Sequence, residues 1–123
     1  TFIGPEAEAI ELMGDKIVSK ELAGKAGVST IPGAEGASGS AEEAGGAAKA
    51  VGYPVMLEAS GGGGGKGMRI VRSDAECLES FERVVSEAKS SFGDSRVLLE
   101  KYINSPRHIE IQILADSHGQ VIH

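Results

Sequence analysis

The sequence predicts an α+β fold in which helices pack on a small sheet and a glycine-rich loop joins two of its strands. Two Ser-x-x-Glu helix starts stand at Ser40 and Ser73. Apolar, strand-like segments flank a glycine run, at 53–57 and 68–71. From residue 30 to residue 102 the expected order is therefore strand, helix, hairpin, helix, strand, which describes a small lid.

Two short helices are expected before residue 30. The first covers 6–14, follows Pro5 and has acidic residues in its first turn. Asp15 is placed to cap the second helix, which extends to about residue 26 and ends at Gly27. Residues 30–33 then form an extended segment that leads into the lid.

The two helices of the lid have clear ends. Each begins with a capping box and ends at a glycine, with Ser40, Glu43 and Gly52 marking the first helix and Ser73, Glu76 and Gly93 the second. In the second helix, apolar residues recur every three or four positions, which predicts a core-facing stripe of Leu78, Phe81, Val85, Ala88 and Phe92. Cys77 of the same helix is expected to be a buried or half-buried thiol.

Further strands are expected after residue 95. Residues 96–102 are typical of a strand with a buried middle, and Pro106 interrupts the chain after it. From His108 to Ile113, isoleucines alternate with polar residues, which predicts a strand with its three isoleucines on one face. Residues 116–119 have the composition of a hairpin turn before a last strand.

The composition of the chain disfavours several kinds of partner and site. The net charge of −6 and the pI near 5.0 disfavour nucleic acid and anionic membranes. No apolar run approaches the roughly 20 residues of a membrane span. Cys77 is the single cysteine, so no intrachain disulfide can form and a reducing compartment is expected. His108, His118 and His123 lack ligand-like spacing, so no metal site is predicted within the chain.

Residues 60–69 read SGGGGGKGMR and carry the main functional signal. Successive glycine N–H groups can turn toward one anion, and Lys66 beside them points to phosphate. The Walker A pattern fails, because it requires Gly at position 60, Ser or Thr at position 67 and a following helix. The G-x-G-x-x-G pattern from Gly62 matches, but the dinucleotide motif also continues into a helix. The loop is expected to be a mobile flap over nucleotide phosphates, with a disordered glycine linker as the alternative.

Six motifs, in order, resemble the biotin carboxylase component of biotin-dependent carboxylases, an ATP-grasp family. They are TFIGP at 1–5, MGDK at 13–16, GYPV at 52–55, the flap, EKY at 100–102 and PRHIEIQ at 106–112. The resemblance covers the whole chain. It implies a ligase that makes carboxyphosphate from ATP and bicarbonate and carboxylates carrier-bound biotin, as in acetyl-CoA, propionyl-CoA, methylcrotonyl-CoA and pyruvate carboxylases.

The resemblance implies that residues 1–29 end the N-terminal domain and its linker helices, 30–102 form the ATP-grasp lid, and 103–123 begin the catalytic domain. Because the chain starts without Met and stops within a strand-like pattern, we expect a fragment of a larger enzyme. The magnesium ligands, the bicarbonate site and the catalytic base are then expected beyond His123, and this chain alone should not turn over. The implied partners are a biotin carboxyl carrier domain and a carboxyltransferase, in a homo-oligomer of the bacterial cytoplasm or the mitochondrial matrix.

The resemblance also implies a set of site residues. Lys16 matches a lysine that reaches the nucleotide phosphates, and Gly64 and Gly65 match glycines that close over them. The adenine hinge corresponds to Glu100, Lys101, Tyr102 and Ile103, and a histidine near the ribose corresponds to His108. By residue type alone, Lys16 and His108 are instead ordinary surface groups, and Glu100 is a strand-end charge.

Glu58 departs from the family pattern. The family has lysine in Y-P-V-x-x-K-A, whereas residues 53–59 here read YPVMLEA. Two unit charges about 4 Å apart interact by roughly 4 kcal/mol at an effective dielectric constant near 20, so reversing this charge should impair the use of ATP. The alternative is that Glu58 turns away or pairs with Lys16 or Lys66.

Three hypotheses therefore compete. The chain is the ATP-binding part of a biotin carboxylase, or a non-catalytic or nucleotide-binding-impaired copy of this family in which Glu58 replaces the lysine. The third is a different ATP-grasp ligase, which would share the flap but lack the motif at 106–110.

Overall fold

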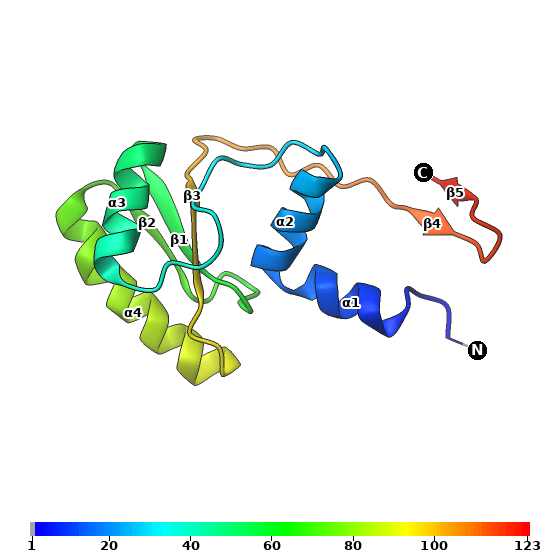
Figure 1. The fold of residues 1–123 in the computed structure, drawn as a ribbon, viewed down its shortest axis with the longest axis horizontal. Helices are drawn as coiled ribbons and strands as arrows, with labels where there is room; N and C mark the ends of the chain where they lie inside the picture. The colour runs from blue at the N-terminus through cyan, green and yellow to red at the C-terminus, as the bar shows by residue number, and fades with distance from the viewer. Residues whose placement is uncertain (1) are drawn as a thin grey trace.

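The computed structural model describes residues 2–123, so Thr1, the first residue of the motif at 1–5, lies outside the described residues. The elements in order are α1 (Ala7–Gly14), α2 (Lys16–Lys25), α3 (Ala41–Val51), β1 (Val55–Ala59), β2 (Met68–Val71), α4 (Asp74–Phe92), β3 (Val97–Lys101), β4 (Leu114–Ala115) and β5 (Val121–Ile122), as Figure 1 shows. None of the helices within residues 2–123 is long and apolar enough to cross a membrane.

Strands β1, β2 and β3 form one antiparallel sheet in the order β2-β1-β3. The central strand is β1, where Leu57 lies opposite Arg69 of β2 and Leu99 of β3. The glycine run joins β1 to β2, so the predicted hairpin is confirmed. Helices α3 and α4 cover one face of this sheet (Figure 1), and the predicted α+β class is confirmed.

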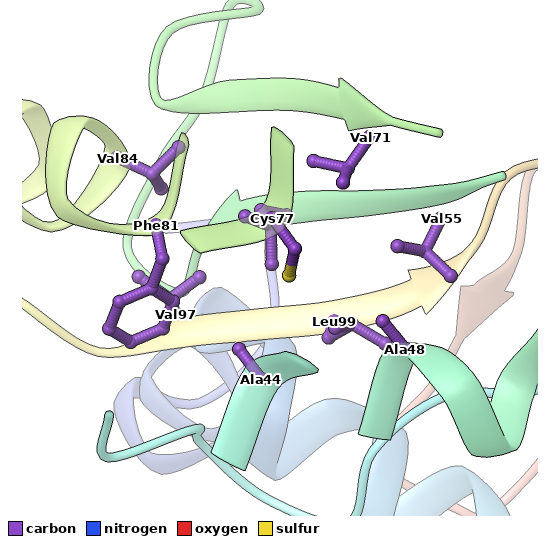
Figure 2. Close-up of a cluster of buried hydrophobic side chains, with 10 residues drawn as sticks. Ala44, Ala48, Val55, Val71, Cys77, Phe81, Val84, Val97 and Leu99 are labelled. Atoms are coloured by element: carbon purple, nitrogen blue, oxygen red, sulfur yellow. The ribbon is translucent and has the colours of Figure 1, made fainter. Parts of the chain in front are cut away.

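The core lies between the sheet and these two helices (Figure 2). Alternate residues of a strand face the same side. Val55, Leu57, Val97 and Leu99 therefore all face the helices, and each is fully buried. The helices contribute Ala44, Ala48, Cys77, Phe81 and Val84. The burial predicted for the Cys77 thiol is confirmed.

The core-facing stripe predicted for α4 is wrong at its first residue. Leu78 is 45% exposed, and the buried residues of the helix are Cys77, Phe81, Val84 and Ala88. Leu78 lies about 100° around the helix axis from Cys77, so a stripe through Cys77 turns Leu78 toward solvent. Phe81 and Ala88 are correctly predicted, while Val85 and Phe92 are half-buried at the edge of the core.

The helix starts predicted at Asp15, Ser40 and Ser73 are confirmed. Each side-chain oxygen accepts backbone N–H groups from the first turn of its helix, at distances of 2.9 to 3.3 Å. Glu76 reaches back and accepts the N–H of Arg72, the residue before the cap, at 2.7 Å. The predicted end of α4 is also correct, since Gly93 adopts a left-handed φ of 74°.

Two predicted strands are wrong. Residues 102–113 contain no strand, and the three isoleucines Ile109, Ile111 and Ile113 are 71%, 69% and 60% exposed. An alternating pattern needs a neighbouring strand for its backbone groups, and residues 108–113 pair with no described strand. Near residue 30 the chain likewise forms only a single bridge to the sheet, between Gly33 and Glu100.

The hairpin turn predicted at 116–119 is confirmed. It joins β4 to β5, which pair in antiparallel fashion. The Asp116 carboxylate accepts the backbone N–H groups of His118 and Gln120, both at 2.9 Å. This hairpin lies far from the three-stranded sheet (Figure 1).

Candidate functional site

Lys16 is the first residue of α2, and its ammonium group lies at the root of the flap. Its Nζ donates to the carbonyl oxygens of Ala59, at 3.3 Å, and Gly62, and lies 3.1 Å from Glu58 Oε1. The side chains of Lys16 and Glu58 are 32% and 17% exposed, so water only partly screens the pair. Lys16 is therefore not a solvated surface lysine in this structure, and Glu58 adopts the pairing with Lys16 that the sequence left open.

The flap between β1 and β2 has the backbone conformation that glycine permits. Gly64 and Gly65 have φ values of 65° and 80°, in the left-handed region. Gly67 has a φ of 68°, and a Cβ at this position would lie 2.8 Å from the Ala59 side chain. The Lys66 side chain is exposed and forms no ion pair with the described residues. The flap thus presents backbone amides and one lysine without bulky side chains.

A hollow of about 410 Å³ lies against the end of β3 and the segment that follows it. All four predicted hinge residues, Glu100, Lys101, Tyr102 and Ile103, line it, together with Met56 and Ile31. Apolar walls beside an exposed backbone suit a flat heteroaromatic ring. The Tyr102 N–H is donated to the Pro54 carbonyl at 3.1 Å, whereas no hydrogen bond to a described residue engages the Ile103 N–H.

A second hollow, of about 450 Å³, adjoins the first, because Ile31 and Glu100 line both. Lys16 and Lys20, one turn apart on α2, lie along its wall. The two hollows share these two wall residues, so together they extend from the hinge segment to the lysines beside the flap. The change from an apolar to a cationic lining fits a ligand with an aromatic end and an anionic end.

The sequence around the two hollows and the flap places the chain in a known family. Residues 15–123 match the family described as carbamoyl-phosphate synthase L chain, ATP binding domain. The chain belongs to this family.

The chain is 58% identical to the alpha chain of human mitochondrial propionyl-CoA carboxylase, over 98% of this chain and 17% of that protein. It is 53% identical to the biotin carboxylase domain of 2-oxoglutarate carboxylase from Hydrogenobacter thermophilus, solved as a dimer with MgADP, ADP and bicarbonate. That match has a TM-score of 0.96 and covers 100% of this chain and 27% of that chain. The predicted resemblance to biotin carboxylases is confirmed.

A third relative differs in arrangement rather than in sequence. The biotin carboxylase domain of a thermophilic 2-oxoglutarate carboxylase, bound to ADP without magnesium, is also 53% identical over the whole of this chain and 27% of its own. Its TM-score is only 0.62. The chain is therefore more similar in structure to the MgADP complex, and it spans between about a sixth and a quarter of the length of these relatives.

Not every predicted site residue lines one of the two hollows. His108 does not line either hollow, and its Nε2 lies 2.8 Å from Glu110 Oε1 in a pair whose side chains are 82% and 83% exposed. Lys101 lines the hinge hollow, but its Nζ donates to the carbonyl oxygens of Gly52 and Tyr53, at 2.7 and 3.0 Å. Its ammonium group thus fixes the turn before β1.

Some residues of the site were not predicted from the sequence. Lys20 pairs with Glu100 at 2.8 Å and fixes the carboxylate between the two hollows. The i, i+4 spacing from Lys16 to Lys20 is the sequence signal that would have indicated it. Asp15 was predicted only as a helix cap, yet its carboxylate also accepts hydrogen bonds from Ser60 and Arg96. No local pattern indicates contacts between residues so far apart in the sequence.

Proposed function

We propose that this chain is the ATP-binding part of a biotin carboxylase, which uses ATP and bicarbonate to carboxylate biotin on a carrier. One observation carries the proposal: the hollow at the hinge segment 100–103 shares two wall residues with the hollow that Lys16 lines, and the Lys16 ammonium contacts the root of the flap. The match to a biotin carboxylase domain solved with MgADP and bicarbonate supports it. We therefore expect the adenine at the hinge and the phosphates between Lys16 and the flap.

The residues of the chain would bind and orient the nucleotide. The Lys16 ammonium and the flap amides supply positive potential for the phosphates, and the flap excludes water when it covers them. The Ile103 N–H is the donor that we propose for the edge of the adenine, and Met56 and Ile31 would pack on its faces. We propose no role for His108 beyond the ribose contact that the resemblance implies.

In the proposed reaction, a bicarbonate oxygen bonds to the γ-phosphorus as the bond to the bridging oxygen of ADP breaks. The carboxyl group of the resulting carboxyphosphate then passes to the ureido nitrogen of biotin, with loss of the nitrogen's proton to a base and release of phosphate. Among residues 2–123, no three His, Cys, Asp or Glu side chains are grouped to hold a metal ion. As the resemblance implies, we propose that the magnesium ligands and the catalytic base lie beyond residue 123, and we assign residues 2–123 no catalytic role.

The remaining partners are proposed from the relatives. A biotin carboxyl carrier domain and a carboxyltransferase belong to the reaction of a biotin-dependent carboxylase, and a homo-oligomer is suggested by the dimer of the 2-oxoglutarate carboxylase domain. The relatives include a mitochondrial enzyme and bacterial enzymes, so we propose the mitochondrial matrix or the bacterial cytoplasm.

The proposal is tested in a complete subunit of the relatives' length. We expect saturable ATP binding, and phosphate release that requires both bicarbonate and biotin. Lys16→Met should raise the KM for ATP by about tenfold, because one charged phosphate contact is lost. Arg83→Met is the matched control, because among residues 2–123 Arg83 pairs only with Glu79, on the exposed surface of α4. ATP hydrolysis that is independent of biotin would favour a different ATP-grasp ligase, and absence of nucleotide binding would favour a non-catalytic copy.

A further inference from the structure

The carboxylate of Asp15 joins three segments of the chain. Its Oδ1 caps α2 by accepting the N–H groups of Ile17 and Val18, at 2.9 and 3.1 Å. The same oxygen accepts the Ser60 hydroxyl at 3.0 Å, and Oδ2 accepts Arg96 Nη2 at 2.6 Å. Asp15 therefore ties the beginning of α2 to the root of the flap and to the residue before β3.

The Arg96 guanidinium is itself fixed in place. It donates to the Asp94 carboxylate through both Nε and Nη2, with a shortest distance of 2.6 Å. The Arg96 carbonyl accepts the Ser60 N–H at 2.9 Å, which joins the same two segments through the backbone. Arg96 Nη2 thus bridges the Asp15 and Asp94 carboxylates in a pair of charge-assisted contacts, and the Arg96 side chain is 48% exposed.

Ser60 is fully buried, although its side chain is polar. Its hydroxyl donates to Asp15, and a buried hydroxyl without a partner would be destabilising. Burial alone would raise the pKa of Asp15, but hydrogen bonds from Val18, Arg96 and Ser60 outweigh it and lower that pKa. The carboxylate therefore stays charged and keeps its four hydrogen-bond partners at neutral pH.

Lys16 follows Asp15 directly, and its ammonium group binds backbone carbonyl groups that come before and after Ser60 in the sequence. Its acceptors are the carbonyl oxygens of Ala59 and Gly62. Of the residues of α2, Ile17 alone is buried, so apolar packing holds this helix weakly on the sheet. In Figure 1 the loop between β1 and β2 extends toward the beginning of α2. The polar contacts of Asp15 thus set where the Lys16 ammonium lies.

We infer that Arg96 is a positioning residue for ATP, because through Asp15 it holds the Lys16 ammonium against the root of the flap. The inference rests on the proposed function. Displacing a binding group by about 1 Å is enough to lower catalysis by up to 100-fold, so loss of the contact should weaken the use of the nucleotide. Removing Arg96 should therefore raise the KM for ATP while leaving the KM for biotin unchanged.

The test measures KM and kcat for ATP and for biotin in a complete subunit. Arg96→Met should raise the KM for ATP by about fivefold or more, with the KM for biotin unchanged. Arg96→Lys keeps the charge, so its KM for ATP should lie between those of the wild type and Arg96→Met. Ser60→Ala leaves the Arg96 pair and the helix cap in place and should raise the KM for ATP in the same direction. Arg83→Met should match the wild type.

The outcomes separate this inference from the proposed function. If the wild-type subunit uses ATP and both Arg96→Met and Ser60→Ala keep its KM for ATP within twofold, the role of Arg96 is wrong and the proposed function stands. Equal increases in the KM for ATP and the KM for biotin would also overturn the role of Arg96, because they indicate general destabilisation. If Arg96→Met does not fold, Ser60→Ala decides. A wild-type subunit that binds no nucleotide overturns both proposals.

Discussion

At the scale of single residues, Glu58 sets the charge of the expected phosphate site. Its carboxylate lies 3.1 Å from the Lys16 ammonium and neutralises the cation that would otherwise face the phosphates. A phosphate group that reaches Lys16 must compete with this carboxylate, and it meets a repulsive charge when it does so. Glu58 is therefore expected to weaken ATP binding without altering the fold of the sheet.

Glu58→Lys in the complete subunit should tighten ATP binding by at least tenfold, or about 1.4 kcal/mol. The change removes a repulsion, frees Lys16 and adds a phosphate contact. The gain should shrink in high salt, because the groups are partly exposed. Calorimetric titration of ATP at low and high salt measures both effects.

Glu58→Gln is the matched control for that substitution. It removes the charge while keeping the shape of the side chain, so its gain in affinity should lie between the wild type and Glu58→Lys. Equal affinities for all three forms would mean that Glu58 does not face the phosphates. The placement of the nucleotide beside β1 would then be withdrawn.

At the scale of elements, α4 holds the sheet through one buried aromatic. Phe81 is 6% exposed and packs against Val97 of the sheet (Figure 2). Phe81→Ala should lower the free energy of unfolding by about 3–5 kcal/mol, whereas Leu78→Ala, at a position that is 45% exposed, should cost less than about 1 kcal/mol. Urea unfolding measures both values. A cost below about 1 kcal/mol for Phe81→Ala would contradict the packing of α4 on the sheet.

The flap should be the most mobile element in the absence of nucleotide, because glycine gains the most backbone entropy on release. The structure narrows the mobile part to residues 63–66, since Ser60 and Gly67 are buried and Gly62 is hydrogen-bonded to Ala59 and Lys16. Amide hydrogen exchange should be fast at 63–66 and slow at Ser60, whose N–H is bound to the Arg96 carbonyl. Exchange at 63–66 as slow as in β3 would refute a mobile flap.

The helices and strands also show which features of the fold could be predicted from the sequence and which could not. Helix ends depend on side chains within one turn, so Asp15, Ser40 and Ser73 could be predicted from local patterns. The contact between Asp15 and Arg96 joins residues 81 positions apart, and no local pattern encodes it. The strand predicted at 108–113 failed for the same reason, because a strand depends on a partner elsewhere in the chain.

The residues of the candidate site likewise include some that continuous motifs predict and others whose positions depend on distant parts of the chain. The hinge segment and the flap were predicted from continuous motifs, and the structure brings the hinge residues together around one hollow. His108 belongs to a continuous motif as well, but its position depends on a segment without regular structure. Lys16 was matched from a motif, whereas its contacts with Glu58 and the flap depend on how α2 docks on the sheet.

At the scale of the whole molecule, three ion pairs join α2 and the residue before it to the three-stranded sheet and its flanking loops. They are Lys16 with Glu58, Lys20 with Glu100, and Asp15 with Arg96. Polar contacts of this kind can form and break without disturbing a core. One relative, solved with ADP and without magnesium, has a TM-score of only 0.62 to this chain. We therefore expect α2 and the sheet to move relative to each other as two bodies.

Distance measurements between spin labels on Lys25→Cys and Ala50→Cys, in α2 and α3, should detect this motion in a complete subunit. Both positions are exposed, whereas Cys77 is buried and its burial raises the pKa of the thiol, so Cys77 should stay unlabelled. Without nucleotide the distance distribution should be broad. With ATP and magnesium it should narrow around one distance, because the phosphates bring Lys16 and the flap together.

A label pair at Ala50→Cys and Glu79→Cys, in α3 and α4, is the control, because both helices pack on the same face of the sheet and should keep their distance. Arg96→Met should leave the distribution of the first pair broad even with ATP and magnesium, since the contact that fixes Asp15 is lost. An identical, narrow distribution with and without nucleotide would mean that α2 and the sheet form one rigid body. The polar contacts of Asp15, Lys16 and Lys20 would then be permanent features of the fold, and the lower TM-score of the relative would have to arise in α1 or in the segment after β3.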